Sequence, residues 1–215
     1  MKQWKRLCPV VVWGLLSLLP DTTAQAQQAK SIGQVTALEG EGTVLHQGKF
    51  APEPLTLQKP VFREDIIETH RASKVRITLT DATVISLAEQ SRLELKQFSH
   101  DARQQTRSGR LAISLGVFRA ILKEILPSST FEVITPTTVA AIRGTDFMGE
   151  VTADSTAIVV LEGTVAVSNV RSWFRGLSNL TPGMGTTVRS DGPPSTPTKW
   201  SESRIEGLLR ATAIQ

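Results

Sequence analysis

Short segments in which apolar and polar residues alternate run through this chain, and this pattern constrains its fold more than any other feature. In residues 74–80, Val75, Ile77 and Leu79 occupy every second position. A two-residue period puts such side chains on one face of a strand and the polar ones on the other, as in a half-buried antiparallel sheet. Residues 83–87 follow after a short turn, and we expect them to form the partner strand.

The same alternation recurs along most of the chain. Clusters of Gly, Pro, Asn and Asp separate the segments about every ten residues, a spacing typical of sandwiches and barrels. We therefore predict an all-β protein, an antiparallel sandwich or roll of the jelly-roll type with many short strands. A Pro-rich stretch at 191–197 separates this body from a short helix expected at 201–213. The other alternating segments are 92–96, 131–134, 157–161 and 164–167.

Residues 110–126 fit two patterns at once. The first half alternates as a strand does, whereas the second half has helical spacing and ends at a proline. Periodicity therefore leaves two alternatives open here, a strand–turn–strand unit and a strand followed by a helix. The alternating residues are Leu111, Ile113, Leu115 and Val117, and those at helical spacing are Phe118, Ile121, Leu122 and Ile125.

The first 26 residues have the three parts of a secretory signal. Basic residues begin the segment, residues 7–19 are mostly apolar, and Ala24 and Ala26 stand at the two positions that a signal peptidase reads. A helix of that apolar length spans about 20 Å, short of the hydrocarbon core of about 30 Å. We predict a cleaved signal peptide over residues 1–26 and a periplasmic or secreted bacterial protein with no transmembrane segment after cleavage. An uncleaved anchor is the alternative.

Composition narrows the classes of function. Removing three of the 24 basic residues and one of the 20 acidic residues with the leader lowers the formal net charge from +4 to +2. A near-neutral chain without a basic stripe is a poor ligand for nucleic acid, because phosphate neutralisation supplies most of that affinity. Cys8 is the one cysteine and lies in the leader. The mature chain would therefore have no disulfide, thiolate metal site or cysteine nucleophile.

No catalytic motif is present in the sequence. It has no Gly-x-Ser-x-Gly elbow, phosphate loop or His-Glu-x-x-His motif. His46, His70 and His100 stand among polar neighbours, and we expect them in solvent-exposed loops rather than at a metal. Glu64 and Asp65 are adjacent, so on a strand they would point to opposite faces. We predict a protein that is not an enzyme and that holds neither a cofactor nor a metal ion.

A more specific pattern occupies residues 131–147. A strand is followed by Thr-Pro, a run of small apolar residues, Arg-Gly-Thr and an aromatic residue. This block resembles the hallmark of the FecR-like domain family, and the flanking segments agree with the family in their order. The resemblance covers roughly residues 32–189 and implies an all-β domain, which we assign to residues 27–190. The residues that follow, 191–215, are expected to form a Pro-rich linker and a short tail helix. The hallmark residues are Thr135, Pro136, Arg143, Gly144, Thr145, Asp146 and Phe147.

The chain departs from the family pattern in two ways. The family's namesake proteins join a cytoplasmic segment that holds a sigma factor to a periplasmic part that senses an outer-membrane transporter. Here only the leader precedes the domain, so we do not expect the sigma-factor role. Two turns also differ, since Ala82 follows Asp81 where Asp-Gly is usual, and residues 63–65 read Arg-Glu-Asp where Gly-Asp is common.

The hallmark turn is the first candidate contact site. Gly144 is expected to supply a backbone conformation that other residues avoid. Arg143 is a fork-shaped donor suited to a carboxylate. Either Arg143 and Asp146 meet a partner, or Arg143 pairs internally with an acid such as Glu162 and fixes the turn. We favour the internal pair, because a corner between strands needs such a contact.

The second candidate is an aromatic segment between two predicted strands. Trp173 and Phe174 are adjacent, with Arg171 and Arg175 on either side. Large aromatics between arginines suit a contact surface for a protein, a sugar or a lipid headgroup. The alternative is a loop that folds back and packs Trp173 on the edge of the sandwich. Three further arginines, which we expect in a solvated loop, are Arg103, Arg107 and Arg110.

These observations together predict an exported, non-enzymatic FecR-like binding or scaffolding module. Its expected partner is a protein of the cell envelope, in agreement with the signalling role of the family it resembles. The alternative is a protein that binds cell-wall or surface polysaccharide through the aromatic loop at Trp173. Nucleic acid is not expected as a partner.

Overall fold

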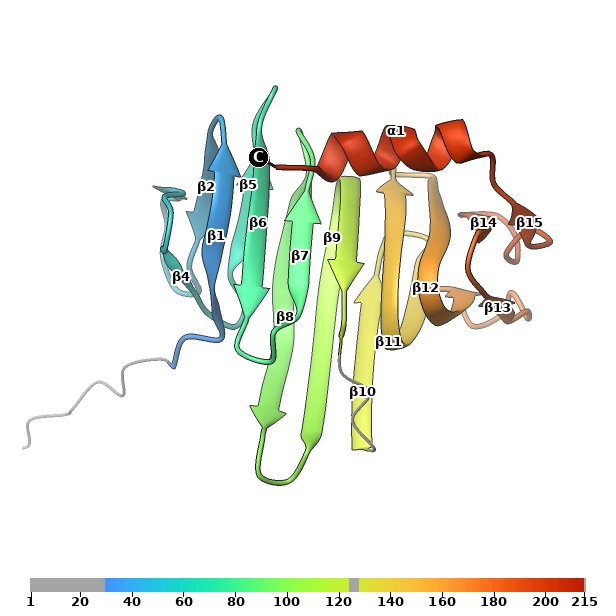
Figure 1. Ribbon diagram of the computed structural model, residues 1–215, viewed down its shortest axis with the longest axis horizontal. Helices are drawn as coiled ribbons and strands as arrows, with labels where there is room; N and C mark the ends of the chain where they lie inside the picture. Colours follow the sequence, from blue (N-terminus) through green and yellow to red (C-terminus); the bar gives the residue numbers. More distant parts are fainter. Residues whose placement is uncertain (1–29, 124–127, 215) are drawn as a thin grey trace, which may run out of the picture.

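Figure 1 shows the computed structural model, which describes residues 30–123 and 128–214. The predicted leader, residues 1–26, lies outside the described residues. Within them, fifteen strands form one continuous mixed sheet, and a single helix follows near the end of the chain. The predicted all-β class with a short C-terminal helix is confirmed. The elements are β1 (Gly33–Glu39), β2 (Gly42–Leu45), β3 (Glu53–Pro54), β4 (Pro60–Val61), β5 (Ile66–Thr69), β6 (Lys74–Leu79), β7 (Val84–Leu87), β8 (Arg92–Asp101), β9 (Thr106–Ile121), β10 (Ser128–Ile134), β11 (Thr138–Val151), β12 (Ser155–Asn169), β13 (Ser178–Leu180), β14 (Met184–Arg189), β15 (Thr198–Lys199) and α1 (Glu202–Thr212).

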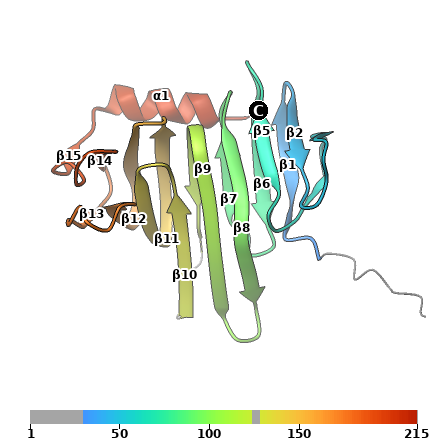
Figure 2. The ribbon, with the colours of Figure 1, turned by 180° about the vertical axis from the view of Figure 1, so that it is seen from behind.

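The sheet folds over into two layers, whose opposite faces are seen in Figures 1 and 2. The first layer has the order β4-β1-β6-β7-β9-β11-β12-β14-β15, and the second has the order β3-β2-β5-β8-β9-β10-β11-β12-β13. Strands β9, β11 and β12 belong to both layers because each is long enough to bend from one to the other. Apolar side chains from the two layers form one hydrophobic cluster, so the layers pack face to face around a shared core.

Glycines lie where β11 and β12 bend. Gly144 has φ 58° and Gly163 has φ 82°, in the left-handed region that favours glycine. The register between the two strands shifts between Arg143 and Asp146. A Cβ on Gly163 would lie 2.3 Å from the carbonyl oxygen of Gly144, so the two backbones pass each other at a distance that excludes a side chain. The expectation that Gly144 supplies a special conformation is confirmed.

Strand β9 covers most of residues 110–126, the segment whose strand or helix character the sequence left open. It continues as a strand through Ile121, and residues 124–127 lie outside the described residues. Leu111 and Ile113 face the core before the bend, whereas Phe118 and Ala120 face it afterwards. The residues that face the core therefore have odd numbers before Gly116 and even numbers after it, and Gly116 itself has φ 99°. This change of phase produced the apparent helical spacing. It also leaves Leu115 49% exposed, contrary to the predicted alternation.

Helix α1 lies across the outer side of the first layer, as Figure 1 shows. Ser201 caps its N-terminus by accepting the N–H of Arg204 at 3.4 Å. Leu208, together with Trp200, covers an outward-facing apolar cluster that includes Met148 and Val159. The helix is thus packed as part of the body. Within the described part of the chain, no helix has the length and hydropathy of a membrane span.

Six residues other than glycine have positive φ in the described parts of the chain, and two of them lie at turns already noted in the sequence. Ala82 has φ 62° and Glu64 has φ 65°, and these are the two positions at which the family pattern has glycine. At the first turn, the side chain of Asp81 stabilises the conformation that lacks a glycine. Its carboxylate accepts two hydrogen bonds from Thr83, one from the backbone N–H at 3.0 Å and one from the side-chain hydroxyl at 2.7 Å. The turn geometry is therefore preserved although the residue type has changed.

We predict that Ala82→Gly stabilises the protein. A left-handed conformation costs a residue with a Cβ about 1–2 kcal/mol. The methyl group of Ala82 is exposed, so packing contributes little stabilising free energy to offset this cost. The free energy of unfolding should rise by about 1 kcal/mol and the melting temperature by about 2–4 °C. Thermal unfolding followed by circular dichroism measures this. Ala51→Gly is the control, because exposed Ala51 has no positive φ. An equal gain in both variants would contradict the explanation.

A side chain at Gly144 should have the opposite effect. Gly144→Val forces a β-branched residue into positive φ, and we expect it to lower the free energy of unfolding by about 1–3 kcal/mol. Gly192→Val is the matched control, since Gly192 has no positive φ and no atom within 4 Å of its would-be Cβ. Chemical denaturation of both variants gives the comparison. Equal stability of the two would show that the bend accepts any residue.

Candidate contact surface

The loop that joins β12 to β13, residues 170–177, carries the largest group of exposed apolar side chains along the described chain. Trp173 is 70% exposed, Leu177 66% and Val170 39%. Trp173 therefore does not fold back onto the edge of the sandwich, which was one of the two alternatives from the sequence. Clustered exposed apolar side chains of this kind mark interaction sites more often than isolated ones do. We call residues 170–177 the aromatic loop.

The base of the aromatic loop is fixed by hydrogen bonds. Asn169 is buried, and its side-chain amide donates to the carbonyls of Arg189 and Gly192 at 2.8 and 2.7 Å. Its carbonyl oxygen accepts the backbone N–H of Arg171 at 2.8 Å. The guanidinium of Arg171 donates to the carbonyl of Ser190 at 2.9 Å. The loop is thus tied to the segment after β14, and its tip is presented from a defined position.

The tip of the aromatic loop combines rings with positive charge. The rings of Trp173 and half-buried Phe174 have centroids 6.1 Å apart. The guanidinium of Arg171 lies 5.7 Å from the Trp173 ring, within the range of a cation–π contact. Neither Arg171 nor exposed Arg175 forms an ion pair with any residue in 30–123 or 128–214. The surface therefore offers stacking area and uncompensated positive charge together.

The Thr-Pro part of the hallmark builds a turn inside the protein. Thr135 precedes Pro136 between β10 and β11, and its hydroxyl accepts the backbone N–H of Thr138 at 3.0 Å. The same hydroxyl lies 2.7 Å from that of Thr156, which in turn accepts from Thr137 at 2.9 Å. These threonines are buried. The threonines of this part of the hallmark therefore maintain the fold, and Pro136 between them is exposed.

The Arg-Gly-Thr part of the hallmark is held by a different ion pair from the one expected. Arg119 donates to both carboxylate oxygens of Asp146, at 2.9 and 2.6 Å, and this pairing raises the pKa of Arg119 above its ordinary value. Arg143 is exposed and makes no ion pair with Glu162. An internal contact does fix the corner, but its arginine comes from β9. The sequence did not indicate it, because the strand character of β9 was undecided there.

The expectation of a solvated loop at residues 99–110 is wrong. Strands β8 and β9 run through most of that stretch. Arg107 is fully buried and pairs with buried Asp81 at 3.1 Å. Arg110 pairs with Glu132 at 2.8 Å across β9 and β10. Of the three arginines, Arg103 alone lies in the exposed turn between the two strands.

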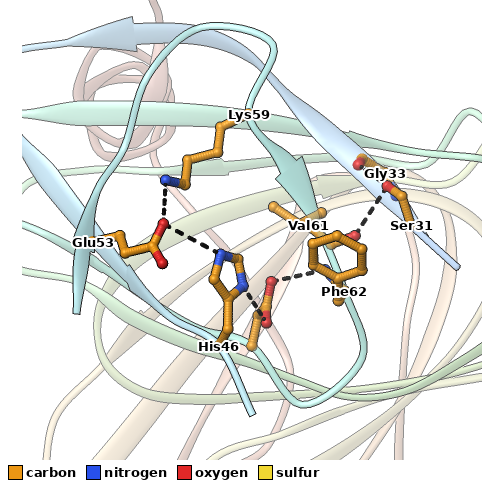
Figure 3. Close-up of polar contacts among 8 residues, drawn as sticks. Ser31, Gly33, His46, Glu53, Lys59, Val61 and Phe62 are labelled. Atoms are coloured by element: carbon orange, nitrogen blue, oxygen red, sulfur yellow. Dashed lines mark hydrogen bonds and ion pairs between the residues drawn. The ribbon is translucent and has the colours of Figure 1, made fainter. Parts of the chain in front are cut away.

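His46 also lies in a different environment from the exposed loop expected for it. Figure 3 shows it between Glu53 and Phe62. Its Nδ1 lies 2.9 Å from Oδ1 of Asp65, whose other oxygen accepts the backbone N–H of Phe62 at 2.7 Å. Burial raises the pKa of Asp65, although these two hydrogen bonds oppose the shift. Lys59 donates to Glu53 at 2.8 Å and lowers the pKa of that carboxyl group.

This histidine cluster has the composition of a structural network. His46 and Asp65 connect β2 to the segment before β5, and no hydroxyl or thiol nucleophile accompanies them in the contacts given above. Within 30–123 and 128–214, no three His, Cys, Asp or Glu side chains converge as a metal site requires. His70 lies 3.9 Å from Glu41 at the surface.

Comparison with known proteins gives the class of this architecture. Residues 65–166 match the model of the FecR protein family, in agreement with the resemblance seen in the sequence. Two crystal structures of a candidate anti-sigma factor from Parabacteroides distasonis, at 1.65 and 2.50 Å resolution, share the fold, with TM-scores of 0.53 and 0.54. They are 16% and 15% identical in sequence to this chain. The similarity covers 67% of this chain and 64% and 63% of theirs, so the chain spans less than two thirds of those proteins. No curated protein matches the chain.

Proposed function

We propose that this protein is an exported, non-enzymatic interaction module of the cell envelope, and that the aromatic loop contacts a partner protein. The observation that carries the proposal is the 70% exposed Trp173 on a hydrogen-bonded base. Rigid, exposed aromatic and arginine side chains are the residues that dominate binding energy at protein interfaces. The FecR domain and the likeness to candidate anti-sigma factors support a role in signalling.

A protein partner agrees better with the composition of the loop than a polysaccharide does. Leu177 and Val170 extend the exposed apolar surface beyond the ring of Trp173. Covering such a surface is favourable by about 25 cal/mol for each Å² of apolar area removed from water. Sugars would instead need several polar side chains around the ring, and the charged groups of the loop are arginines. We infer that the partner combines an apolar patch with acidic residues.

The aromatic loop can be tested without damage to the core. Trp173→Ala combined with Phe174→Ser should abolish binding of the envelope partner while the melting temperature stays within about 2 °C, since surface changes cost only about 0.5 kcal/mol. The measurement is quantitative capture from envelope extract with the tagged protein as bait. Phe50→Ser is the matched control, because Phe50 is an exposed aromatic residue that lies outside the aromatic loop, in the β2–β3 connection.

The outcomes separate the alternatives. Proteins captured by the unmodified and Phe50→Ser baits, but not by the double variant, identify the loop as the contact surface. Equal capture by all three baits would place the contact elsewhere. Co-sedimentation with peptidoglycan that depends on Trp173, without a captured protein, would favour the polysaccharide. A marked fall in melting temperature would show that Phe174 contributes to the core.

The proposed export of the protein can be tested at its N-terminus. If the signal peptidase reads Ala24 and Ala26, the exported protein should begin at Gln27. Mass spectrometry of the protein purified from the periplasm or culture medium determines this directly. Recovery of intact Met1 in the membrane fraction would overturn the export proposal and indicate an uncleaved anchor.

A further inference from the structure

A second surface lies at the other end of the sheet from the aromatic loop. A cavity of about 330 Å³ opens where five segments distant in the sequence meet, two of which contribute Gln47 and Thr80. The segment before β1 contributes Lys30, the connection from β4 to β5 contributes Phe62 and Arg63, and β8 contributes Phe98 and His100. In Figure 1, β1 and β4 lie at one side of the molecule, whereas β13, β14 and β15 lie at the opposite side. The cavity and the aromatic loop are therefore separate sites.

The walls of the cavity carry cationic side chains and no carboxylate. These cations are Lys30 and Arg63; the ring of His100 also lines the cavity, and Arg103 lines an adjoining hollow. None of the four lies within ion-pair distance of an acid in the described parts of the chain. Asp101, in the adjoining hollow, accepts the backbone N–H groups of Arg103 and Gln104 at 2.9 and 3.1 Å. The cavity therefore has a positive field that an anion would neutralise.

Phe62, one aromatic wall of the cavity, is held in place by the network around His46. The backbone N–H of Phe62 is bound by Asp65, and the ring packs edge-to-face on His46 with centroids 5.5 Å apart (Figure 3). Phe98 is only 5% exposed and is anchored in the core. Apolar walls with a few polar groups directed inward are typical of sites for small molecules, and the volume lies at the lower end of their range.

We propose that this cavity binds a small organic carboxylate whose apolar part lies between Phe62 and Phe98. The forked guanidinium of Arg63 matches a carboxylate in a bidentate pair, and Lys30 adds a second positive charge. The rings supply apolar contact for an aryl or alkyl group. This chemistry is shared by a free aryl-alkyl acid and by the C-terminal residue of a peptide that ends in an aromatic side chain.

The test uses probes that differ in charge and in source. Isothermal titration calorimetry of the full protein should detect 3-phenylpropanoate, the free acid, or acetyl-Ala-Phe, the peptide acid, and should detect neither of the corresponding neutral amides. Tighter binding of one acid than the other identifies the source. Binding should weaken as salt concentration rises, since the exposed end of the site is screened.

Matched variants decide whether the cavity is responsible. Arg63→Gln should weaken binding of the acid at least tenfold, whereas Arg71→Gln, at another exposed arginine outside the cavity, should leave it unchanged. Circular dichroism confirms that both variants are folded. Binding of neither acid by the unmodified protein, equal binding of an acid and its amide, or equal effects of the two substitutions would overturn the proposal. Arg63→Gln should retain envelope capture through the aromatic loop, so failure of one site is distinguishable from failure of the other.

Discussion

Three long strands must leave one layer and enter the other, and each does so at a glycine in a conformation that other residues avoid. Gly116, Gly144 and Gly163 provide these bends in β9, β11 and β12. Because β11 and β12 are hydrogen-bonded neighbours, their bends must coincide, and the contact between Gly163 and the Gly144 carbonyl leaves no space for a Cβ. Beyond the bend, Phe118 and Phe147 meet edge-to-face at 5.5 Å. The shared core therefore depends on these bends.

Buried charge contributes a second constraint away from the bends. Asp81 follows β6 in the first layer, and Arg107 lies in the part of β9 that belongs to the second layer, so their ion pair joins the two layers. Such a pair adds little net stability, but loss of one partner leaves a buried charge and costs about 3–5 kcal/mol. The guanidinium also lies 5.8 Å from the ring of Phe131. The pair therefore connects the two layers at a buried point near this ring.

The sequence predicts those features that depend on neighbouring residues, and it fails for contacts between distant ones. Alternation identified the strands around residues 75–87, and the hallmark block identified the family and the bend at Gly144. The change of phase at Gly116 could not be recognised, because a glycine that bends a strand and one that ends it look alike in sequence. The partners of Arg107, His46 and Asp146 lie 19 to 27 residues away along the chain. Only strand order brings them together, and periodicity does not determine strand order.

The hallmark residues that resemble the family differ in their role from the loop residues proposed to contact a partner. Thr135 is used in a buried turn, and Asp146 is occupied by Arg119. The hallmark residues therefore form the corner of the fold. Of the two charged residues among them, Arg143 is exposed and Asp146 is not. The family match ends at residue 166, before the aromatic loop begins. A domain whose shared residues are used in bending its strands can vary its connecting loops without loss of the core. This division of roles supports the proposal that Trp173 and its neighbours, outside the segment that matches the family model, select the partner.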